Sequence, residues 1–241
     1  MRIAIISDIH SNADALINVL DDIKRFKVDK TISLGDNIGY GPEPNKTISL
    51  LIENKIPSVM GNHELGVLNK KLIKQFNPIA QFALNKTIET INLNSLEYVR
   101  QSNNYISKYG SHFVHGMPPD SPTSYMSKTS GKETIDLFNK IFCNICFIGH
   151  THDLKMAVLR SDSIEYKILK NDLYSLSKDK KYLINAGSVG QPRDGNKTSK
   201  YLIFDNVSYR ILVRYIHYDR EKVINKMLEL GYPIEHTIRL K

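Results

Sequence analysis

Apolar and polar positions in the first sixty residues follow an alternating order of short strands and helices. Residues 3–6 form a continuous apolar run, the pattern of a strand covered on both faces. Asn12 can cap a helix whose apolar residues keep helical spacing at Leu16, Val19, Leu20, Ile23 and Phe26. Further strands are predicted at residues 30–34 and 57–60, with a helix that ends near residue 54 between them. This order predicts parallel strands joined by right-handed crossovers.

The second half of the chain changes from helices to strands and turns. Helical spacing between residues 77 and 100 is followed by a predicted hairpin around Tyr109-Gly110. Further strands are expected at residues 145–148, 155–159, 163–169, 182–185, 200–205 and 209–216, with helices at 131–141 and after Asp219. We expect an α/β fold, a four-layer α/β/β/α sandwich in which two mixed sheets pack face to face with helices outside. No linker or repeat interrupts the pattern, so a single domain is predicted over residues 1–241.

Composition and charge narrow the classes of protein. The chain of 241 residues is 41% hydrophobic and 24% charged, as expected for a globular protein with a substantial core. Its formal net charge is +8, but the Lys residues are spread along the chain, so a nucleic-acid partner is an alternative and not the leading interpretation. The apolar stretches are far shorter than the roughly 20 residues of a membrane span, and no signal-peptide core is present. We expect a cytoplasmic protein without membrane contact.

The two cysteines, Cys143 and Cys146, form a C-x-x-C pair in an apolar run that approaches a predicted strand. A thioredoxin-like pair lies at a helix N-terminus, and a structural zinc site needs further ligands nearby. The sequence offers neither context here. Buried reduced thiols are therefore expected.

Five apolar segments run into short turns that carry Asp, His or Asn, in most cases beside glycine. They are IISDIHSN with Asp8 and His10, ISLGDN with Asp36, VMGNHE with Asn62 and His63, FVHG with His115, and FIGHTHD with His150 and His152. The carboxyl ends of strands in an open α/β sheet converge on one ligand crevice. Glycine permits sharp turns and close approach of backbones. We expect these side chains to meet in space.

These residue types predict a metal site. Asp, His and Asn without a thiolate suit mixed oxygen and nitrogen coordination of Mn²⁺, Fe or Zn²⁺. The candidate ligands exceed what one tetrahedral zinc ion takes, and they fit two ions that share a carboxylate. Asp8-x-His10 and His150-x-His152 would each place two side chains on the same side of an extended segment. We expect two divalent ions, Mn²⁺ first, with Fe, Zn²⁺, Ni²⁺ and Mg²⁺ as the alternatives.

The ordered motifs resemble those of the calcineurin-like metallophosphoesterases, in particular the small prokaryotic phosphodiesterases and phosphatases. The matching residues are Asp8-x-His10, Gly35-Asp36, Gly61-Asn62-His63-Glu64, His115 and Gly149-His150-x-His152, and residues 185–193 resemble a Gly-Ser-rich block of that group. The resemblance implies that one metal is held by Asp8, His10 and His152, the other by Asn62, His115 and His150, with Asp36 bridging. It further implies that a water bridging ions about 3.5–4 Å apart is activated as hydroxide. His63 would act as general acid for the leaving oxygen or as a cationic stabiliser.

One departure from the superfamily pattern bears on the substrate. Phosphoprotein phosphatases carry an Arg in a G-D-x-x-D-R-G block, whereas this chain reads Gly35-Asp36-Asn37-Ile38-Gly39-Tyr40-Gly41. The missing Arg argues against a Ser/Thr protein phosphatase and against the diadenosine-tetraphosphate hydrolases that share the block. Arg193 is a candidate replacement, because a guanidinium can bind two phosphate oxygens at once. Asn37 is a second candidate for substrate binding.

The remaining polar residues near these motifs are interpreted as structural. Glu64 and Asp153 directly follow candidate ligands and are expected at the surface or in support of the ligands. Asn12 is expected to act only as a helix cap. The other histidines lack the glycine context and are interpreted as ordinary residues; they are His112, His217 and His236.

The leading hypothesis is a metal-dependent phosphodiesterase or phosphatase that acts on a small phosphorylated substrate, with nucleotides among the candidates. A nuclease that uses the same site and a metal-binding scaffold without turnover are the alternatives. Loops at residues 39–44 and 117–130 are expected to shape the pocket. The choice between monoester and diester and the oligomeric state are not set by the sequence.

Overall fold

The computed structural model describes residues 1–126, 130–160 and 163–241. In chain order its elements are β1 (Arg2–Ile6), α1 (Ala13–Arg25), β2 (Lys30–Ser33), α2 (Pro44–Glu53), α3 (Asn62–Leu68), η1 (Lys70–Gln75), α4 (Pro78–Thr90), α5 (Leu93–Arg100), β3 (Tyr105–Lys108), β4 (Ser111–Val114), α6 (Gly131–Phe138), β5 (Ile145–Ile148), β6 (Leu154–Leu159), β7 (Ile164–Ile168), β8 (Leu173–Ser175), β9 (Lys181–Ala186), β10 (Ser199–Asp205), β11 (Arg210–Ile216), α7 (Arg220–Glu229) and η3 (Ile234–Thr237). The hairpin and the predicted caps are confirmed: Asn12 accepts a hydrogen bond from the backbone N of Ala15, and Asp219 caps α7.

Five elements differ from the sequence-based expectation. The predicted strand at residues 57–60 is wrong, since Ser58 and Val59 form only isolated bridges, with Ser33 and Asn103. The helices α3, η1 and η3 and the strand β8 were not predicted. All four are short, so each offers too few positions for a periodic pattern of apolar residues to stand out.

The strands form two mixed sheets. The five-stranded sheet has the order β2-β1-β10-β11-β8, and the six-stranded sheet has the order β3-β4-β5-β9-β6-β7. Strands β1 and β2 are parallel, and so are β4, β5 and β9. In the register of the first sheet, Ile5 lies between Ile32 and Leu202. Because these parallel strands point the same way within each sheet, the turns that follow them gather at one edge.

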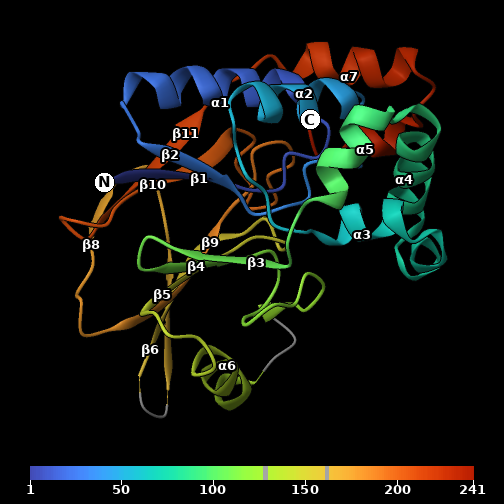
Figure 1. Cartoon of the computed structure of the whole chain (residues 1–241). Coiled ribbons are helices and arrows are strands. Elements are labelled where there is room, and N and C mark those ends of the chain that lie inside the picture. The colour runs from blue at the N-terminus through green and yellow to red at the C-terminus, as the bar shows by residue number, and fades with distance from the viewer. Residues whose placement is uncertain (127–129, 161–162) are drawn as a thin grey trace.

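Alternation along the strands explains the layers. Ala4 and Ile6 pack with the helices that cover the five-stranded sheet, and Ile3 and Ile5 pack against the six-stranded sheet. Figure 1 shows α1, α2 and α7 above the first sheet, with the second sheet beneath it and α6 at the base. The predicted four-layer α/β/β/α arrangement is confirmed.

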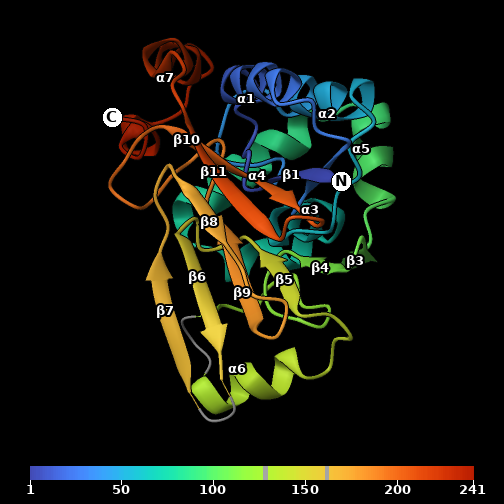
Figure 2. The ribbon, with the colours of Figure 1, turned by 90° about the vertical axis from the view of Figure 1, so that its left-hand side faces the viewer.

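The outer face of the six-stranded sheet is covered by α6 (Figure 2). Cys146 and Ile148 of β5 pack there with Phe138 of α6, and Cys146 is fully buried. Cys143 lies before β5 and is only half-buried. Both cysteines are free thiols, as expected, but Cys143 is not part of a strand.

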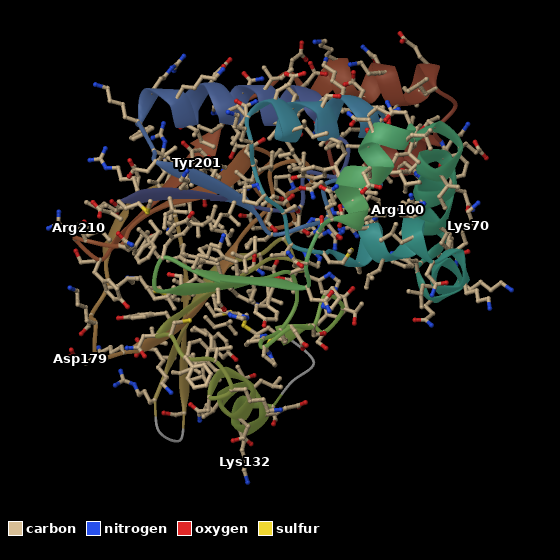
Figure 3. The ribbon with its side chains drawn as sticks, viewed as in Figure 1. Lys70, Arg100, Lys132, Asp179, Tyr201 and Arg210 are labelled. Carbon is tan, nitrogen blue, oxygen red and sulfur yellow. The ribbon has the colours of Figure 1, made fainter. Side chains whose placement is uncertain are left out.

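A buried polar contact links α1 to the five-stranded sheet. Tyr201 of β10 lies beneath α1 (Figure 3), and its hydroxyl donates to Oδ2 of Asp22 at 2.7 Å. The same carboxylate accepts two hydrogen bonds from Arg214 of β11, from Nε at 2.9 Å and from Nη2 at 3.0 Å. The helix is therefore fixed to two neighbouring strands. Among the described residues, no helix has the length and apolar character needed to cross a bilayer.

Candidate metal centre

Asp8, His10 and His152 each bring one ligand atom into a first cluster. The three atoms lie within 4.8 Å of one another, and all three side chains are buried. Nε2 of His152 lies 3.1 Å from Oδ1 of Asp8 and 3.1 Å from Nε2 of His10. Asp8 and His10 follow β1 of one sheet, whereas His152 follows β5 of the other. The cluster therefore joins the two sheets.

Asp36, His115 and His150 form a second buried cluster. Nε2 of His115 lies 3.3 Å from Oδ2 of Asp36, 3.2 Å from Nδ1 of His150 and 3.1 Å from Oδ1 of Asn62. Oδ2 of Asp36 also lies 3.8 Å from Nε2 of His10, in the first cluster. Asp36 thus lies between the two groups of ligands, where a shared carboxylate is expected.

Backbone carbonyl groups set the orientation of the four imidazole rings. A carbonyl oxygen can only accept a hydrogen bond, so the ring nitrogen that contacts it must carry the proton. The contacts are His10 Nδ1 to Ile38 O (3.2 Å), His115 Nδ1 to Leu34 O (2.7 Å), His150 Nε2 to Thr123 O (3.2 Å) and His152 Nδ1 to Gln191 O (2.6 Å). In the neutral rings, the other nitrogen of each then presents a lone pair to the clusters, as metal-ligating histidines do.

The residues present fit bound cations. The Nε2 atoms of His10 and His152 lie 3.1 Å apart, and because both rings donate through Nδ1, their lone pairs face each other. Oδ1 of Asp8 is buried and has no hydrogen-bond donor among the described residues. A cation between these atoms would relieve both the repulsion and the unmet hydrogen-bonding capacity. The two buried Asp and His clusters are consistent with a dinuclear metal site.

The expectation of extended segments at Asp8-x-His10 and His150-x-His152 is wrong. Five of the candidate ligands have left-handed backbone: Asp8 (φ 52°), His10 (φ 50°), Asp36 (φ 51°), His150 (φ 69°) and His152 (φ 62°). Each such residue costs about 1–3 kcal/mol and persists only where the surrounding structure enforces it. The side chains converge because the turns are tight, not because alternate residues of a strand share a face.

Two glycines permit the close packing of these turns. A Cβ on Gly61 would lie 2.2 Å from Oδ1 of Asp36, and a Cβ on Gly149 would lie 2.1 Å from Oγ of Ser7 and 2.7 Å from Oδ2 of Asp8. Such distances are shorter than any side chain tolerates. The predicted role of glycine beside the ligands is confirmed at these two positions.

Burial and neighbouring charges shift the pKa values of the cluster residues in opposite directions. Burial alone would lower the pKa of His115, but the charge of Asp36, with smaller contributions from Asp8 and Glu64, raises the pKa to about 9. Burial lowers the pKa of His150 to about 3, and the neighbouring His115 adds to that effect. Burial would also raise the pKa of Asp36, but the surrounding histidines hold it well below its usual value. Asp36 is therefore ionised at neutral pH.

His63 lies in the first turn of α3 and lines the pocket beside the clusters. Its Nε2 is 3.9 Å from Oδ2 of Asp36, and its buried Nδ1 has no hydrogen-bond partner in the described part of the chain. Burial, opposed in part by the charge of Asp36, lowers the pKa of His63 to about 4. This shift disfavours the cationic form, so hydrogen-bond donation by a neutral ring is the better-supported role.

Glu64 supports the ligand turns from within. It is fully buried, and its two carboxylate oxygens accept hydrogen bonds from the backbone N atoms of Asp36 (2.8 Å), Asn37 (2.7 Å) and Gly61 (3.0 Å). A surface position for Glu64 is therefore excluded. Asp153, in contrast, is half-buried, with an oxygen 3.7 Å from Nζ of Lys155.

A pocket of about 260 Å³ opens onto the two clusters. Its lining consists of Asp36, Tyr40, Asn62, His63, Gln75, Phe76, Asn77, Thr123, Tyr125, His150, His152 and Arg193. Both loops expected to shape it contribute, since Tyr40 comes from one and Thr123 and Tyr125 from the other; residues 127–129 of the second loop lie outside the described residues. Tyr125 stacks on His150, with 3.8 Å between ring centroids. The pocket has the size of a small substrate.

The two residues expected to bind substrate differ in position. Arg193 lines the pocket, donates to Oε1 of Gln191 at 2.9 Å, and places its guanidinium carbon 5.7 Å from the ring centroid of Tyr40. Asn37 is fully buried, and its side chain bonds to the hydroxyls of Ser33 and Ser58 instead. The expectation that Asn37 binds substrate is therefore wrong, because its amide is used to fix the turn.

Sequence reasoning missed the residues that support the ligands from the end of β9 and the loop after it. Gln191 orients His152 through its carbonyl oxygen, Oγ of Ser188 donates to the backbone O of Asp8 at 2.8 Å, and Asn185 donates to Gly149 O at 2.6 Å. In the sequence, residues 185–193 carry a resemblance to a family block and the candidate Arg193, but no signal for these supporting contacts. Gln75, Phe76 and Asn77 carried no signal in the sequence that would place them in the pocket.

Comparisons with known proteins agree with this site. The family model described as calcineurin-like phosphoesterase matches residues 1–154. An uncharacterised protein of Methanocaldococcus jannaschii is 36% identical over 237 residues, which cover 96% of this chain and 93% of that protein. A crystal structure of a metallophosphoesterase from Sphaerobacter thermophilus has a TM-score of 0.84 at 32% identity, covering 100% of this chain and 98% of that chain. A hypothetical protein from Pyrococcus horikoshii OT3 shares the fold, with a TM-score of 0.79 at 16% identity over 99% of this chain and 97% of that one.

The family model spans well over half of this chain, and the Sphaerobacter structure matches this chain along its whole length. The matched region contains the Asp and His residues of both clusters. The chain therefore belongs to the calcineurin-like phosphoesterase family and is a metallophosphoesterase.

Proposed function

We propose that this enzyme hydrolyses small phosphate monoesters or diesters with two divalent cations, Mn²⁺ first. The observation that supports the proposal is the convergence of two buried ligand clusters on one carboxylate, that of Asp36, at the floor of a small pocket. Bound divalent cations would supply an activated water and would neutralise charge on the phosphate oxygens.

The ligand assignment follows the two clusters. One cation would be held by Asp8, His10 and His152, and the other by Asn62, His115 and His150. Asp36 would contact both, because its Oδ2 faces His10 on one side and His115 on the other. The carbonyl groups behind the four rings fix which nitrogen of each ring faces the clusters before any ligand binds, which lowers the entropic cost of forming the site.

Two further side chains would act on the substrate. His63 faces the pocket from α3, where its ring N–H can donate to the leaving oxygen of the ester. Arg193 lines the pocket from the loop after β9, where its guanidinium can bind a phosphate oxygen. These two roles are proposals that rest on position and on unused hydrogen-bonding capacity.

The first experiment measures turnover of bis(4-nitrophenyl) phosphate and of 4-nitrophenyl phosphate by the Mn²⁺-loaded enzyme. We expect release of 4-nitrophenol that stops on chelation and returns when Mn²⁺ is added back. Asp36→Asn should lower kcat about a hundredfold or more, because the ligand shared by both clusters loses its charge. The variant should still fold, since the remaining carboxamide oxygen can accept from the backbone N of His63, as Oδ1 does at 2.9 Å.

Asp153→Asn is the matched control, because it removes a carboxylate that is next to His152 in the chain and lies 3.7 Å from Nζ of Lys155. It should retain full activity. Equal turnover by the Asp36→Asn and wild-type enzymes would contradict the proposed site. A metal-loaded protein that is inert to small esters but cleaves single-stranded or duplex DNA would show a nuclease, and one inert to all of these substrates would show a scaffold.

A further inference from the structure

The loop after β9 and the C-terminal segment form a cationic rim beside the pocket, made of Arg193, Lys197 and Arg239. Nζ of Lys197 donates to the backbone O of Arg239 at 3.3 Å, which brings the two segments together. Figure 2 shows this loop, in orange, beside the red C-terminal segment below α7. Leu240, next to Arg239, packs with Tyr40, and both line a small void with Gln191. The rim is therefore continuous with the wall of the pocket.

The three cations of the rim have no acidic partner. None of them lies within ion-pair distance of a carboxylate in the described ranges 1–126, 130–160 and 163–241. The carboxylate next to Arg193 in the chain is that of Asp194, and it is already bound: its Oδ1 accepts from Nζ of Lys200 at 2.7 Å. Lys200 is fully buried and also donates to the carbonyl of Thr198 at 3.1 Å. The carboxylate that neighbours Arg193 in the chain is therefore paired with Lys200 and not with the rim.

Arg193 lies between the metal-ligand clusters and the outer part of the rim. It shares the pocket with His63 and His152 on its inner side. On its outer side it repels Arg239, whose pKa is lowered first by burial and then by the charge of Arg193. Like charges repel, and an anion bound between the two guanidinium groups would relieve the repulsion. The positive charge of the pocket wall therefore continues from Arg193 to Arg239.

We propose that the substrate carries a second phosphate group, which Arg193 and Arg239 bind at the rim while the scissile phosphate lies at the metal-ligand clusters. This inference rests on the proposed function and narrows its substrate class to organic or inorganic diphosphates. A guanidinium offers two parallel N–H donors to phosphate oxygens, which makes Arg the residue suited to such a subsite. Lys197 adds charge and holds the backbone of Arg239 in place.

The test measures binding and does not depend on turnover. Isothermal titration calorimetry on the Mn²⁺-loaded enzyme gives the Kd of methylenediphosphonate and of methylphosphonate, which differ by one phosphonate group and resist hydrolysis. The informative quantity is the Kd of methylphosphonate divided by the Kd of methylenediphosphonate. This ratio expresses the preference for a second phosphonate. Arg239→Gln should reduce this ratio about 5- to 10-fold, the effect of one charge-assisted contact at a solvent-exposed position.

Arg210→Gln is the matched control, because it removes the same charge at the start of β11, where Figure 3 shows Arg210 at the left edge of the molecule. The ratio should stay at its wild-type value in this variant. An Arg239→Gln enzyme that keeps the wild-type ratio, or an equal fall in both variants, would overturn the proposal. Thermal unfolding of Arg239→Gln provides the check on folding.

A further arm identifies the source of the second phosphate. If α,β-methylene-ADP loses affinity in Arg239→Gln as methylenediphosphonate does, the subsite serves an organic diphosphate; if only methylenediphosphonate does, it serves the inorganic compound. Either result supports the subsite. Failure of the proposed function is distinguished separately, because it would appear as an absence of aryl phosphate hydrolysis by the wild-type enzyme whatever the calorimetry shows.

Discussion

Asp22→Asn probes the contact that fixes α1 to the five-stranded sheet. The carboxylate is only 6% exposed and accepts from the hydroxyl of Tyr201 and from two nitrogens of Arg214. Asparagine retains one acceptor oxygen and turns an NH₂ group toward donors. A hydrogen bond to a charged group contributes about 1.5–3 kcal/mol, and the 26% exposure of Arg214 reduces the ionic part. We expect a loss of about 2–3 kcal/mol in the free energy of unfolding.

The assay is urea denaturation at several pH values, with thermal unfolding beside it. For a chain of this length, the expected loss corresponds to a fall in Tm of roughly 4–12 °C. Burial would raise the pKa of Asp22, but the hydrogen bonds from Arg214 and Tyr201 lower it below the ordinary value of 3.8. Its stabilising contribution is therefore complete above about pH 4 and is lost as the pH falls through the lowered pKa. The gap between wild type and Asp22→Asn should be constant from pH 7 to 5 and should narrow below about pH 4.

Asp21→Asn is the neighbouring control, since Asp21 is 57% exposed and pairs with Lys24 on the surface of α1. Its effect should be within about 0.5 kcal/mol. The reasoning is refuted if the two variants are equally stable, or if the gap for Asp22→Asn persists unchanged in acid. Aryl phosphate turnover at pH 7 should match the wild type in both.

Three further predictions concern the site and its supports. Gly149→Ala should weaken Mn²⁺ binding, measured by calorimetry, because its Cβ would displace Ser7 and Asp8, whereas Gly131→Ala has open space and should bind normally. Lys200→Met should lower the free energy of unfolding, measured by urea denaturation, by about 2–4 kcal/mol, because it leaves the carboxylate of Asp194 and backbone carbonyls without their partner. An unchanged denaturation midpoint would contradict this. Mn²⁺ at a hundred times its Kd should add about 2.7 kcal/mol to the free energy of unfolding, and a Tm independent of Mn²⁺ would exclude binding to the native state.

The fold was largely predictable because its signals are local and periodic. Continuous apolar runs such as residues 3–6 and 145–148 indicate strands covered on both faces, and the caps at Asn12 and Asp219 set where helices begin. The strand expected at residues 57–60 failed because apolar character alone does not supply a pairing partner along its length. Helix α3 was missed because its first turn reads as a ligand motif and the helix is short.

The ligand set was predictable from residue type, but its geometry was not. Left-handed backbone at Asp8 and His150 depends on tertiary contacts, for example the close approach of Gly149 to Ser7. The misplacement of Asn37 has a similar cause. A side chain that follows a strand can point into the pocket or back into the loop, and hydrogen bonds with the hydroxyls of Ser33 and Ser58 hold Asn37 in the loop. One partner, Ser33, is only four residues away and the other, Ser58, is 21 residues away, and neither belongs to a motif that would identify it in the sequence.

The hydrogen bond from Nδ1 of His152 to the carbonyl of Gln191 has a thermodynamic consequence. The same short loop carries Arg193 into the pocket. Any ligand that orders this loop therefore also restrains a metal-binding imidazole, and any cation that immobilises the imidazole restrains the loop. Cation and anion affinities must then be linked, each raising the other by the same factor. Apparent metal affinity measured with saturating phosphonate should exceed that of the enzyme alone.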